Sequence, residues 1–261
     1  MKLEFLTQED PIYILPFFVE FLRSYADSFQ VTRISVCKVM GSRSRKKLLR
    51  EMVALYGPLG LTRLLGRMGA AYLLGRIPAS RNAAHYFSML QVARAYGIEY
   101  ESIEDPNSAE FLAGVSKRQS DMIVSVACPY MLRSDLLSLP ALGCVNIHHG
   151  PLPRYKGMMP TFWQLYRGES AVGLTIHRMT EKLDRGAPLL QEYMPVLRNE
   201  SLHGLIRRSK RTAAHGLARV LKSVEANTLV TKPAIQEKGT YFTFPTLNEI
   251  RDFRRRGLRA I

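Results

Sequence analysis

A continuous apolar run, DMIVSVAC at residues 121–128, is the feature that most constrains the fold of this chain. A strand with apolar side chains on both faces is typical of the centre of a parallel sheet, because helices cover both sides of such a sheet. Strands and helices alternate on either side of this run. The predicted strands span residues 1–6, 31–40, 98–103 and 143–148, and the predicted helices span residues 13–27, 83–96, 108–117 and 136–139. The pattern predicts an α/β fold with a Rossmann-like, mostly parallel sheet and helices on both faces.

Two segments fall outside this alternation. Residues 41–81 are rich in Leu, Gly and Arg, and we predict that they form a helical insertion within a catalytic domain of residues 1–200. Residues 201–261 begin with a predicted helix at 202–224, continue through a weak strand region and end in a basic tail. We therefore expect a short, basic C-terminal helical extension there.

Charge gives a second constraint. The chain has a formal net charge of +15 at pH 7, with basic clusters at residues 43–50, 207–211 and 251–259. Such a chain attracts anionic partners, which include nucleic acid, phosphorylated small molecules and acidic membrane surfaces. Solvated helix faces account for any single cluster, whereas the total excess of positive charge indicates an anionic partner.

The composition indicates a cytoplasmic globular protein. Three cysteines at wide spacing, Cys37, Cys128 and Cys144, predict reduced thiols and no metal site. The N-terminal stretch MKLEFLTQED becomes acidic before a signal-peptide core can form, so no secretory signal is expected. No uncharged apolar run reaches the roughly 18 residues that a membrane-spanning helix needs.

The strand at residues 143–148 ends in side chains suited to catalysis. Asn146 and His148 are two residues apart, so they point to the same face of the strand, while Ile147 and His149 point to the other. An amide donor beside an imidazole can stabilise a developing oxyanion and move a proton. Two prolines then restrict the backbone of the following loop, GPLPRYKG. On this pattern alone, a pair of hydrogen-bonded structural side chains is the alternative.

Several motifs in a fixed order give a more specific indication. An N-x-H strand end is followed by an LP-x-Y-[KR]-G loop, a proline three residues later, a G-x-T-[IL] strand and an L-D-x-G turn. In this chain these motifs are Asn146-Ile147-His148, Leu152–Gly157, Pro160, Gly173–Ile176 and Leu183–Gly186. In this order of motifs the chain resembles the folate-dependent formyltransferases, which include methionyl-tRNA formyltransferases and sugar-nucleotide N-formyltransferases. The resemblance covers residues 85–196 well and the first 40 residues only by pattern.

The resemblance implies the formyltransferase fold and the transfer of a formyl group from the cosubstrate 10-formyltetrahydrofolate to a primary amine. It also implies roles for individual residues. Asn146 and protonated His148 would stabilise the oxygen of a tetrahedral intermediate. Asp184 would hold the imidazole and accept a proton from the amine, directly or through water. The pterin would bind against two segments, which are Tyr130, Met131 and Leu132 after the central strand and the loop of Thr180, Glu181, Lys182, Leu183 and Asp184.

The chain departs from the family pattern at Gly150. A serine usually stands at this point of the motif, so any contact from its hydroxyl is lost. His149 and His177 have no role in the implied mechanism, and we expect both to be packed or hydrogen-bonded within the protein. The N-terminal strand lacks a glycine-rich dinucleotide fingerprint, so no nicotinamide or flavin site is expected.

Three acceptor classes are open within this resemblance. Methionyl-tRNA formyltransferases carry a further C-terminal domain, and the residues after Val196 are expected to be too few for it. Glycinamide ribonucleotide formyltransferases generally lack the proline found here at Pro160. The LPRYKGMMP loop and the run GLTIHRMTEKLDRG resemble those of sugar-nucleotide N-formyltransferases. A nucleotide-linked amino sugar is therefore the expected acceptor, its phosphates would use part of the positive charge, and nucleic acid is the less favoured partner.

Other functions stay open. The same three residues could hydrolyse formyltetrahydrofolate with water as the acceptor. Alternatively, the chain could be a folate- or nucleotide-binding module that retains the fold without turnover. The 41–81 insertion is expected to complete the core as a helical hairpin or to form a homodimer contact. Its basic and apolar composition also fits peripheral contact with a membrane surface.

Overall fold

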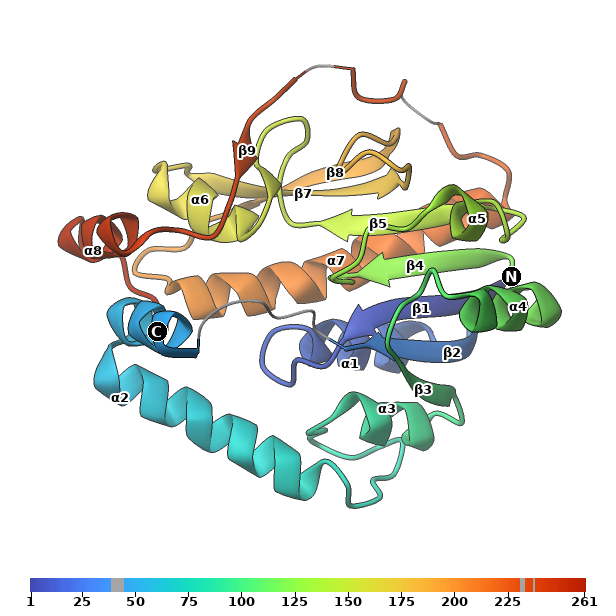
Figure 1. Cartoon of the computed structure of the whole chain (residues 1–261), viewed down its shortest axis with the longest axis horizontal. Coiled ribbons are helices and arrows are strands. Elements are labelled where there is room, and N and C mark those ends of the chain that lie inside the picture. Colours follow the sequence, from blue (N-terminus) through green and yellow to red (C-terminus); the bar gives the residue numbers. More distant parts are fainter. Residues whose placement is uncertain (39–44, 231–232, 237) are drawn as a thin grey trace.

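The computed structural model describes residues 1–38, 45–230, 233–236 and 238–261. Its main feature is a seven-stranded sheet with the order β3-β2-β1-β4-β5-β7-β8 (Figure 1). The strands are β1 (Lys2–Gln8), β2 (Gln30–Cys37), β3 (Glu99–Ile103), β4 (Met122–Val126), β5 (Cys144–His148), β7 (Ala171–Arg178) and β8 (Pro188–Pro195). The first five are parallel to one another, β7 is antiparallel to β5, and β8 is antiparallel to β7. The predicted α/β fold with a mostly parallel sheet is confirmed.

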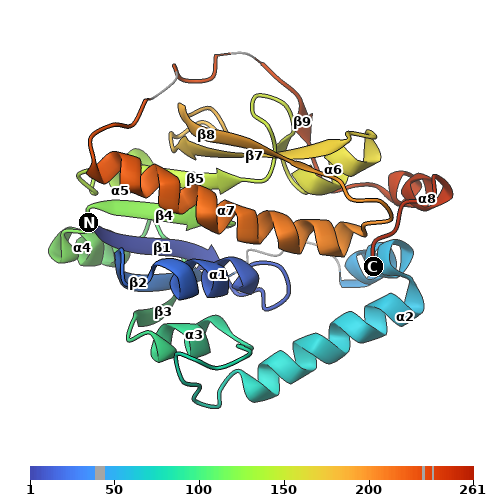
Figure 2. The same cartoon turned by 180° about the vertical axis from the view of Figure 1, so that it is seen from behind.

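Helices connect the strands and cover the sheet. They are α1 (Leu15–Tyr25), α2 (Arg45–Leu74), α3 (Met89–Ala95), α4 (Ala109–Arg118), α5 (Ser134–Leu137), α6 (Pro160–Tyr166), α7 (Leu202–Glu225) and α8 (Leu247–Arg255). Figure 2 shows α1 and α7 across one face of the sheet, and Figure 1 shows α4 and α5 on the other. Strand residues alternate between the faces, so Phe5 and Val124 pack on the α1–α7 side while Leu6 and Ile123 pack on the α4–α5 side.

The helix predicted at residues 83–96 is shorter in the structure, where α3 covers only its second half. Ser88 caps α3, because its hydroxyl accepts a hydrogen bond from the backbone N–H of Gln91. The backbone before Ser88 is held by tertiary contacts, among them a hydrogen bond from the Arg23 guanidinium to the carbonyl oxygen of Ala83. The prediction was wrong for this first half, since side chains from other elements replace the helical hydrogen bonds there.

The described part of the predicted 41–81 insertion is mainly the helix α2. At Gly57 the backbone has φ 70° and ψ 168°, and Pro58 follows, so the helix kinks there. Before the kink α2 packs against α8, with Leu55 and Phe253 in one buried cluster. After the kink it exposes several large apolar side chains, which include Leu59, Leu65, Met68, Tyr72 and Leu73. The homodimer and membrane contacts expected of this insertion stay predictions. No helix in the described part of the chain combines the length and apolar character needed to cross a membrane.

The C-terminal part is built into the fold. Ala213 and Leu217 of α7 are fully buried in the same core as the strands. Further on, β9 (Tyr241–Phe242) pairs with β6 (Lys156–Gly157) in a small second sheet, and the basic tail forms α8. The proposed domain division at residue 200 stays a prediction, and α7 covers one face of the seven-stranded sheet.

Candidate active site

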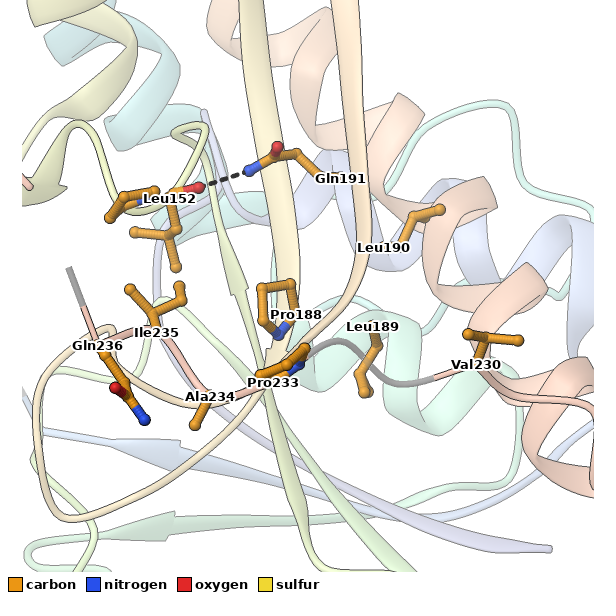
Figure 3. A pocket seen from close by; sticks show the side chains of 11 residues that line it. Leu152, Pro188, Leu189, Leu190, Gln191, Val230, Pro233, Ala234, Ile235 and Gln236 are labelled. Atoms are coloured by element: carbon orange, nitrogen blue, oxygen red, sulfur yellow. Dashed lines mark hydrogen bonds between the residues drawn. The ribbon is translucent and has the colours of Figure 1, made fainter.

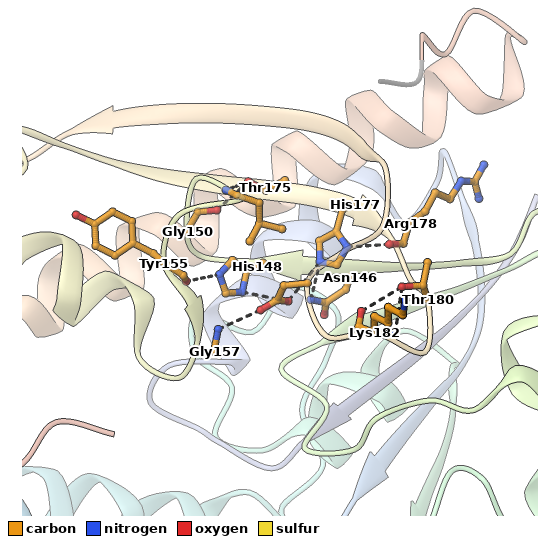
Figure 4. A network of polar contacts seen from close by, with 12 residues as sticks. Asn146, His148, Gly150, Tyr155, Gly157, Thr175, His177, Arg178, Thr180 and Lys182 are labelled. Carbon is orange, nitrogen blue, oxygen red and sulfur yellow. Dashed lines mark hydrogen bonds and ion pairs between the residues drawn. The ribbon is translucent and has the colours of Figure 1, made fainter. Parts of the chain in front are cut away.

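The predicted catalytic side chains converge at the carboxyl ends of the parallel strands β4 and β5 (Figure 4). Val145 and Ile147 of β5 belong to the core under α1 and α7, so Asn146 and His148 face the other side of the sheet. The loop between β7 and β8 brings Asp184 to the same place. In open α/β sheets, ligands bind in the crevice at the carboxyl ends of the strands, where loops supply the side chains that line the site.

His148 is buried, and each of its ring nitrogens faces an oxygen. Nε2 donates a hydrogen bond to the carbonyl oxygen of Tyr155 at 2.8 Å. A carbonyl oxygen can only accept, so the hydrogen of the neutral ring lies on Nε2. Nδ1 lies 3.6 Å from Oδ1 of Asp184. Nδ1 is therefore the nitrogen that can gain and lose a proton beside the carboxylate.

Asp184 is a buried carboxylate that is held by the last residue of the LP-x-Y-[KR]-G motif. Its Oδ2 accepts a hydrogen bond from the backbone N–H of Gly157 at 3.1 Å. Its Oδ1 lies 3.6 Å from Nδ1 of His148 and 3.7 Å from Nε2 of His177. Gly157 has φ 90°, and a Cβ there would lie 2.2 Å from the carbonyl oxygen of Phe242, so only glycine fits. The glycine of this motif thus places an N–H donor against the carboxylate.

The Asn146 amide is held by His177, which lies opposite it on β7. Asn146 Nδ2 donates to His177 Nε2 at 3.2 Å, and His177 Nδ1 donates to the carbonyl oxygen of Arg178 at 2.8 Å. The bond from Asn146 requires a neutral ring, because a protonated Nε2 could not accept it. Burial lowers the pKa of His177 to about 4, with repulsion from His148 acting in the same direction. The sequence predicted a packed or hydrogen-bonded His177 but missed its contact with Asn146, because that contact depends on the antiparallel pairing of β5 and β7.

Gly150 lets the Tyr155 carbonyl reach the imidazole. A Cβ at position 150 would lie 2.9 Å from His148 Nε2 and 3.0 Å from the Tyr155 carbonyl oxygen. The hydroxyl of Thr175 donates to the Gly150 carbonyl at 2.7 Å and fixes the same turn. The departure from the family serine therefore has a structural reason, since this loop conformation leaves no room for a side chain there.

A first cavity, of about 70 Å³, opens beside the end of β4. Asp184 lines it, and so do six of the seven other predicted pterin contacts, namely Tyr130, Met131, Leu132, Thr180, Lys182 and Leu183. The seventh, Glu181, instead accepts a hydrogen bond from the N–H of Ser134 at 3.1 Å. Leu132 is only 2% exposed, whereas Met131 at 47% offers apolar surface at the mouth of the cavity. The structure brings the two predicted segments together, and their contact with a pterin stays a prediction.

A second cavity, of about 300 Å³, is lined by all three predicted catalytic residues. Asn146 and Asp184 line both cavities, and His148 lines the second. Asn146 and Asp184 therefore stand at the wall between the two spaces, with His148 beside them. A group-transfer site needs this arrangement, because donor and acceptor must approach the reacting carbon together.

Two residues near the second cavity connect it to α7. His149 is turned away from the catalytic face, and its Nδ1 lies 2.7 Å from the hydroxyl oxygen of Ser209, in agreement with the expected hydrogen-bonded role. Lys210 lines the cavity and is only 6% exposed. The sequence placed Lys210 in a solvated basic cluster, and only the packing of α7 against the sheet reveals that it faces the site.

A larger cavity, of about 670 Å³, lies between β8 and residues 233–236 (Figure 3). It shares no described lining residue with the two cavities at the catalytic residues. Gln191 Nε2 donates to the Leu152 carbonyl oxygen at its edge. Among the described residues that line it, none is titratable. The described part of its lining therefore offers no acid, base or nucleophile for catalysis.

Fold and site together define a class of protein. A mostly parallel α/β sheet carries an amide, an imidazole and a buried carboxylate at the carboxyl ends of its strands, between two cavities. Such groups serve reactions in which a carbonyl oxygen becomes negative and a proton moves. The chain belongs to the formyl transferase family, since the family model with the description "Formyl transferase" matches residues 79–221, more than half of the chain.

Curated relatives agree with this family. The chain is 36% identical over 132 residues to the methionyl-tRNA formyltransferase of Synechocystis sp., which covers 51% of this chain and 40% of the relative. It is 37% identical over 139 residues to the methionyl-tRNA formyltransferase of Syntrophus aciditrophicus, with coverage of 53% and 44%. The matched part thus spans less than half the length of these two relatives.

Solved structures share the fold. Glycinamide ribonucleotide transformylase 1 from Symbiobacterium toebii matches with a TM-score of 0.58 at 17% identity, over 92% of both chains. A sugar N-formyltransferase from a Shewanella species matches with a TM-score of 0.56 at 19% identity, over 97% of this chain and 87% of that one. At these identities the likeness establishes the fold alone.

Proposed function

We propose that this protein transfers a formyl group from 10-formyltetrahydrofolate to a primary amine. The observation that carries the proposal is the position of Asn146, His148 and Asp184 at the wall between two cavities of about 70 Å³ and 300 Å³. Membership of the formyl transferase family supports the same reaction. Each group in this wall can be given a chemical task.

Asn146 is the proposed donor to the reacting oxygen. The lone pair of a neutral amine attacks the formyl carbon, a carbon–nitrogen bond forms, and the formyl oxygen becomes negative. One N–H of the Asn146 amide is engaged by His177, which leaves the second N–H for this oxygen. A well-placed donor of this kind stabilises the transition state by roughly 3–4 kcal/mol.

His148 and Asp184 are the proposed proton-handling pair. Collapse of the tetrahedral intermediate breaks the bond between the formyl carbon and N10 of the folate, which takes a proton, while the new amide nitrogen loses one. Asp184 can accept the proton of the amine, directly or through water, and His148 Nδ1 lies 3.6 Å from its Oδ1. The Tyr155 carbonyl holds Nε2 of His148, so the ring keeps its orientation while Nδ1 exchanges the proton. The products are a formylated amine and tetrahydrofolate.

We propose that the folate donor binds at the first cavity, beside the end of β4. A pterin needs an apolar slot with polar groups at its edge. Met131 and Leu183 supply exposed apolar surface there, and the backbones of the two flanking loops supply polar groups. With the pterin on this side, the formyl group would meet Asn146 at the inner wall of the cavity.

We further propose that the accepting amine belongs to an amino sugar linked to a nucleotide. The loop LPRYKGMMP and the run GLTIHRMTEKLDRG support this acceptor by their resemblance to sugar-nucleotide N-formyltransferases. The ammonium group of Lys210 in the second cavity supports an acceptor that carries phosphate. A structural neighbour with a TM-score of 0.56, a sugar 3N-formyl transferase solved in the presence of dTDP and 5-N-formyl-THF, shares the fold at 13% identity.

Methionyl-tRNA is the second candidate acceptor. The curated relatives described above are methionyl-tRNA formyltransferases at 36% and 37% identity over about half of this chain. The net charge of +15 also suits a nucleic acid. The salt dependence of binding distinguishes the two acceptors. Binding of RNA neutralises many phosphates at once, so it would weaken steeply as the salt concentration rises. Binding of a diphosphate involves far fewer charges and would weaken much less.

Product analysis tests the proposal. The purified chain is incubated with 10-formyltetrahydrofolate and, in separate reactions, with a panel of nucleotide-linked amino sugars, glycinamide ribonucleotide and methionyl-tRNA. We expect at least one formylated sugar and no formylation of methionyl-tRNA. Efficient formylation of methionyl-tRNA alone would overturn the sugar assignment and keep the chemistry. Free formate without a formylated amine would indicate a hydrolase, and binding of folate without turnover would indicate a binding module.

A further inference from the structure

Three basic side chains form a stripe along α7. His203, Arg207 and Lys210 are spaced by four and three residues, so they lie on one face of the helix. This face meets α2, because Arg67 Nη1 donates to His203 Nε2 at 3.1 Å. The stripe starts at the contact with the insertion helix and ends in the cavity beside the catalytic residues.

Lys210 is buried without a counterion in contact. It is 6% exposed and lines the second cavity with Asn146, His148 and Asp184. No hydrogen bond or ion pair joins its ammonium group to any described residue. Asp10 is the carboxylate that acts on Lys210 electrostatically, but its Oδ1 already accepts two backbone hydrogen bonds at 2.8 Å each. Burial lowers the pKa of Lys210 to about 8, as expected of a cation held away from water.

Arg207 and Arg67 line another cavity, of about 340 Å³, which shares no described lining residue with the second cavity. Neither forms an ion pair with a described carboxylate, and the Nε of Arg207 is buried without a hydrogen-bond partner. Burial lowers the pKa of the Arg207 guanidinium, and the charges of Arg211 and Arg67 act in the same direction. The two cations are thus held close to each other in the protein alone.

His203 is a neutral histidine between the two arginines. Its Nε2 accepts from the Arg67 guanidinium, which can only donate, so the hydrogen of the ring lies on Nδ1, 3.3 Å from the Tyr13 hydroxyl oxygen. Burial, followed by the charges of Arg207 and Arg67, lowers the pKa of His203 to about 4. A neutral histidine therefore positions Arg67 without adding to the repulsion.

We propose that Lys210, Arg207 and Arg67 form an anion subsite that binds the linked phosphoryl groups of the acceptor. Lys210 is a buried cation without a counterion, which costs stability, and a diphosphate supplies the missing negative charge. Its further oxygens can accept hydrogen bonds from the half-buried Arg207 and the exposed Arg67. Positions 207 and 210 are neighbours on the helix surface, about 5–6 Å apart at Cβ, so two linked phosphoryl groups can contact both. Lys210 shares its cavity with the catalytic residues, which places the phosphoryl group nearest the amine beside it.

This subsite gives the insertion helix a task in substrate binding. Arg67 comes from α2, and its contact with His203 joins residues that are 136 positions apart in the sequence. The assignment of the anion as part of the acceptor rests on the proposed formyl transfer. The carboxylates of the folate are the other anions that the reaction brings to the site, so the test must separate the two ligands.

The experiment measures the binding of inorganic pyrophosphate and of uridine diphosphate by calorimetry, without any turnover. Lys210→Met and Arg207→Met remove one charge each and keep most of the side-chain volume. Arg219→Met is the matched control, because Arg219 lies on the same helix but pairs with Glu192 at the surface. We expect Lys210→Met and Arg207→Met to weaken both ligands at least about tenfold, the loss typical of one charged hydrogen bond, and Arg219→Met to change them less than about twofold. The affinity for 5-formyltetrahydrofolate should stay within about twofold of wild type in all three variants.

Several outcomes would overturn the subsite. They are the absence of saturable pyrophosphate binding by the wild-type chain, unchanged affinity in both folded variants, or a loss of folate affinity in place of diphosphate affinity. Replacing a buried charged side chain by an apolar one is often neutral for folding. If Lys210→Met nevertheless fails to fold, Lys210→Arg provides the second test, because it keeps the charge and should retain diphosphate binding. If diphosphate binding follows these expectations while no amine is formylated, the subsite stands and the proposed reaction fails.

Discussion

Asn146 and His177 face each other across the antiparallel strands β5 and β7, with 3.2 Å between Nδ2 of the amide and Nε2 of the imidazole. The Arg178 carbonyl oxygen accepts a hydrogen bond from His177 Nδ1 at 2.8 Å. Nε2 of the neutral ring is therefore an acceptor, and this fixes the orientation of the Asn146 amide. His177 therefore positions the group that is proposed to stabilise the formyl oxygen.

The first prediction concerns this positioning. His177→Ala removes the acceptor and lets the Asn146 amide rotate, and we expect kcat to fall by about tenfold or more while the KM for the folate changes less than about twofold. His177→Gln offers an amide oxygen to Asn146 and should recover part of the loss. Steady-state kinetics on both variants checks this. An unchanged kcat in a folded His177→Ala protein would remove the positioning role.

The second prediction concerns stability in acid. Burial lowers the pKa of His177 to about 4 from its ordinary value of 6.5. Between these values the unfolded chain binds a proton that the folded chain does not, so the folded state loses stability as the pH falls. The contribution is fully present above pH 6.5 and is lost towards pH 4, with a size of about 3 kcal/mol. Denaturant unfolding at several pH values should therefore show a smaller decline over this range for His177→Gln than for wild type, and equal declines would contradict the account.

The third prediction concerns the catalytic pair. His148→Ala and Asp184→Asn should each abolish formyl transfer while the protein keeps its fold. Asn at position 184 retains an oxygen for the Gly157 N–H and tolerates the positive φ of 50°. Circular dichroism and thermal unfolding control for the fold, and product formation measures activity. Near-normal turnover in either variant would eliminate the proposed mechanism.

The fourth prediction concerns the donor side. Met131→Asp places a charge at the mouth of the first cavity, and we expect it to weaken folate binding by about tenfold or more. Met131 is a better choice than Leu132, which is 2% exposed and packed in the core, so that a charge there would unfold the protein. Met158→Asp is the matched control, because Met158 is equally exposed at 47% and lines neither catalytic cavity. Equal affinities of the two variants in a titration would show that the pterin binds elsewhere.

Local patterns were sufficient for the fold class and for the choice of Asn146 and His148 as candidates. The apolar run of β4 and the period-2 alternation of β5 depend on neighbours in the sequence, so they can be read without knowing the rest of the structure. The same holds for Asn146 and His148, whose spacing puts them on one face. Asp184 could be chosen only through the order of family motifs, because nothing local joins it to His148.

Tertiary structure alone decided the remaining features of the site. Asn146 meets His177 because β7 runs antiparallel to β5 in one particular register, and Arg67 meets His203 because α2 packs beside α7. Lys210 reads as one more basic residue in the sequence, and only the burial of α7 against the sheet turns it into a cation at the cavity. Periodicity shows which face of an element a side chain occupies, whereas the packing of distant elements decides what that face meets.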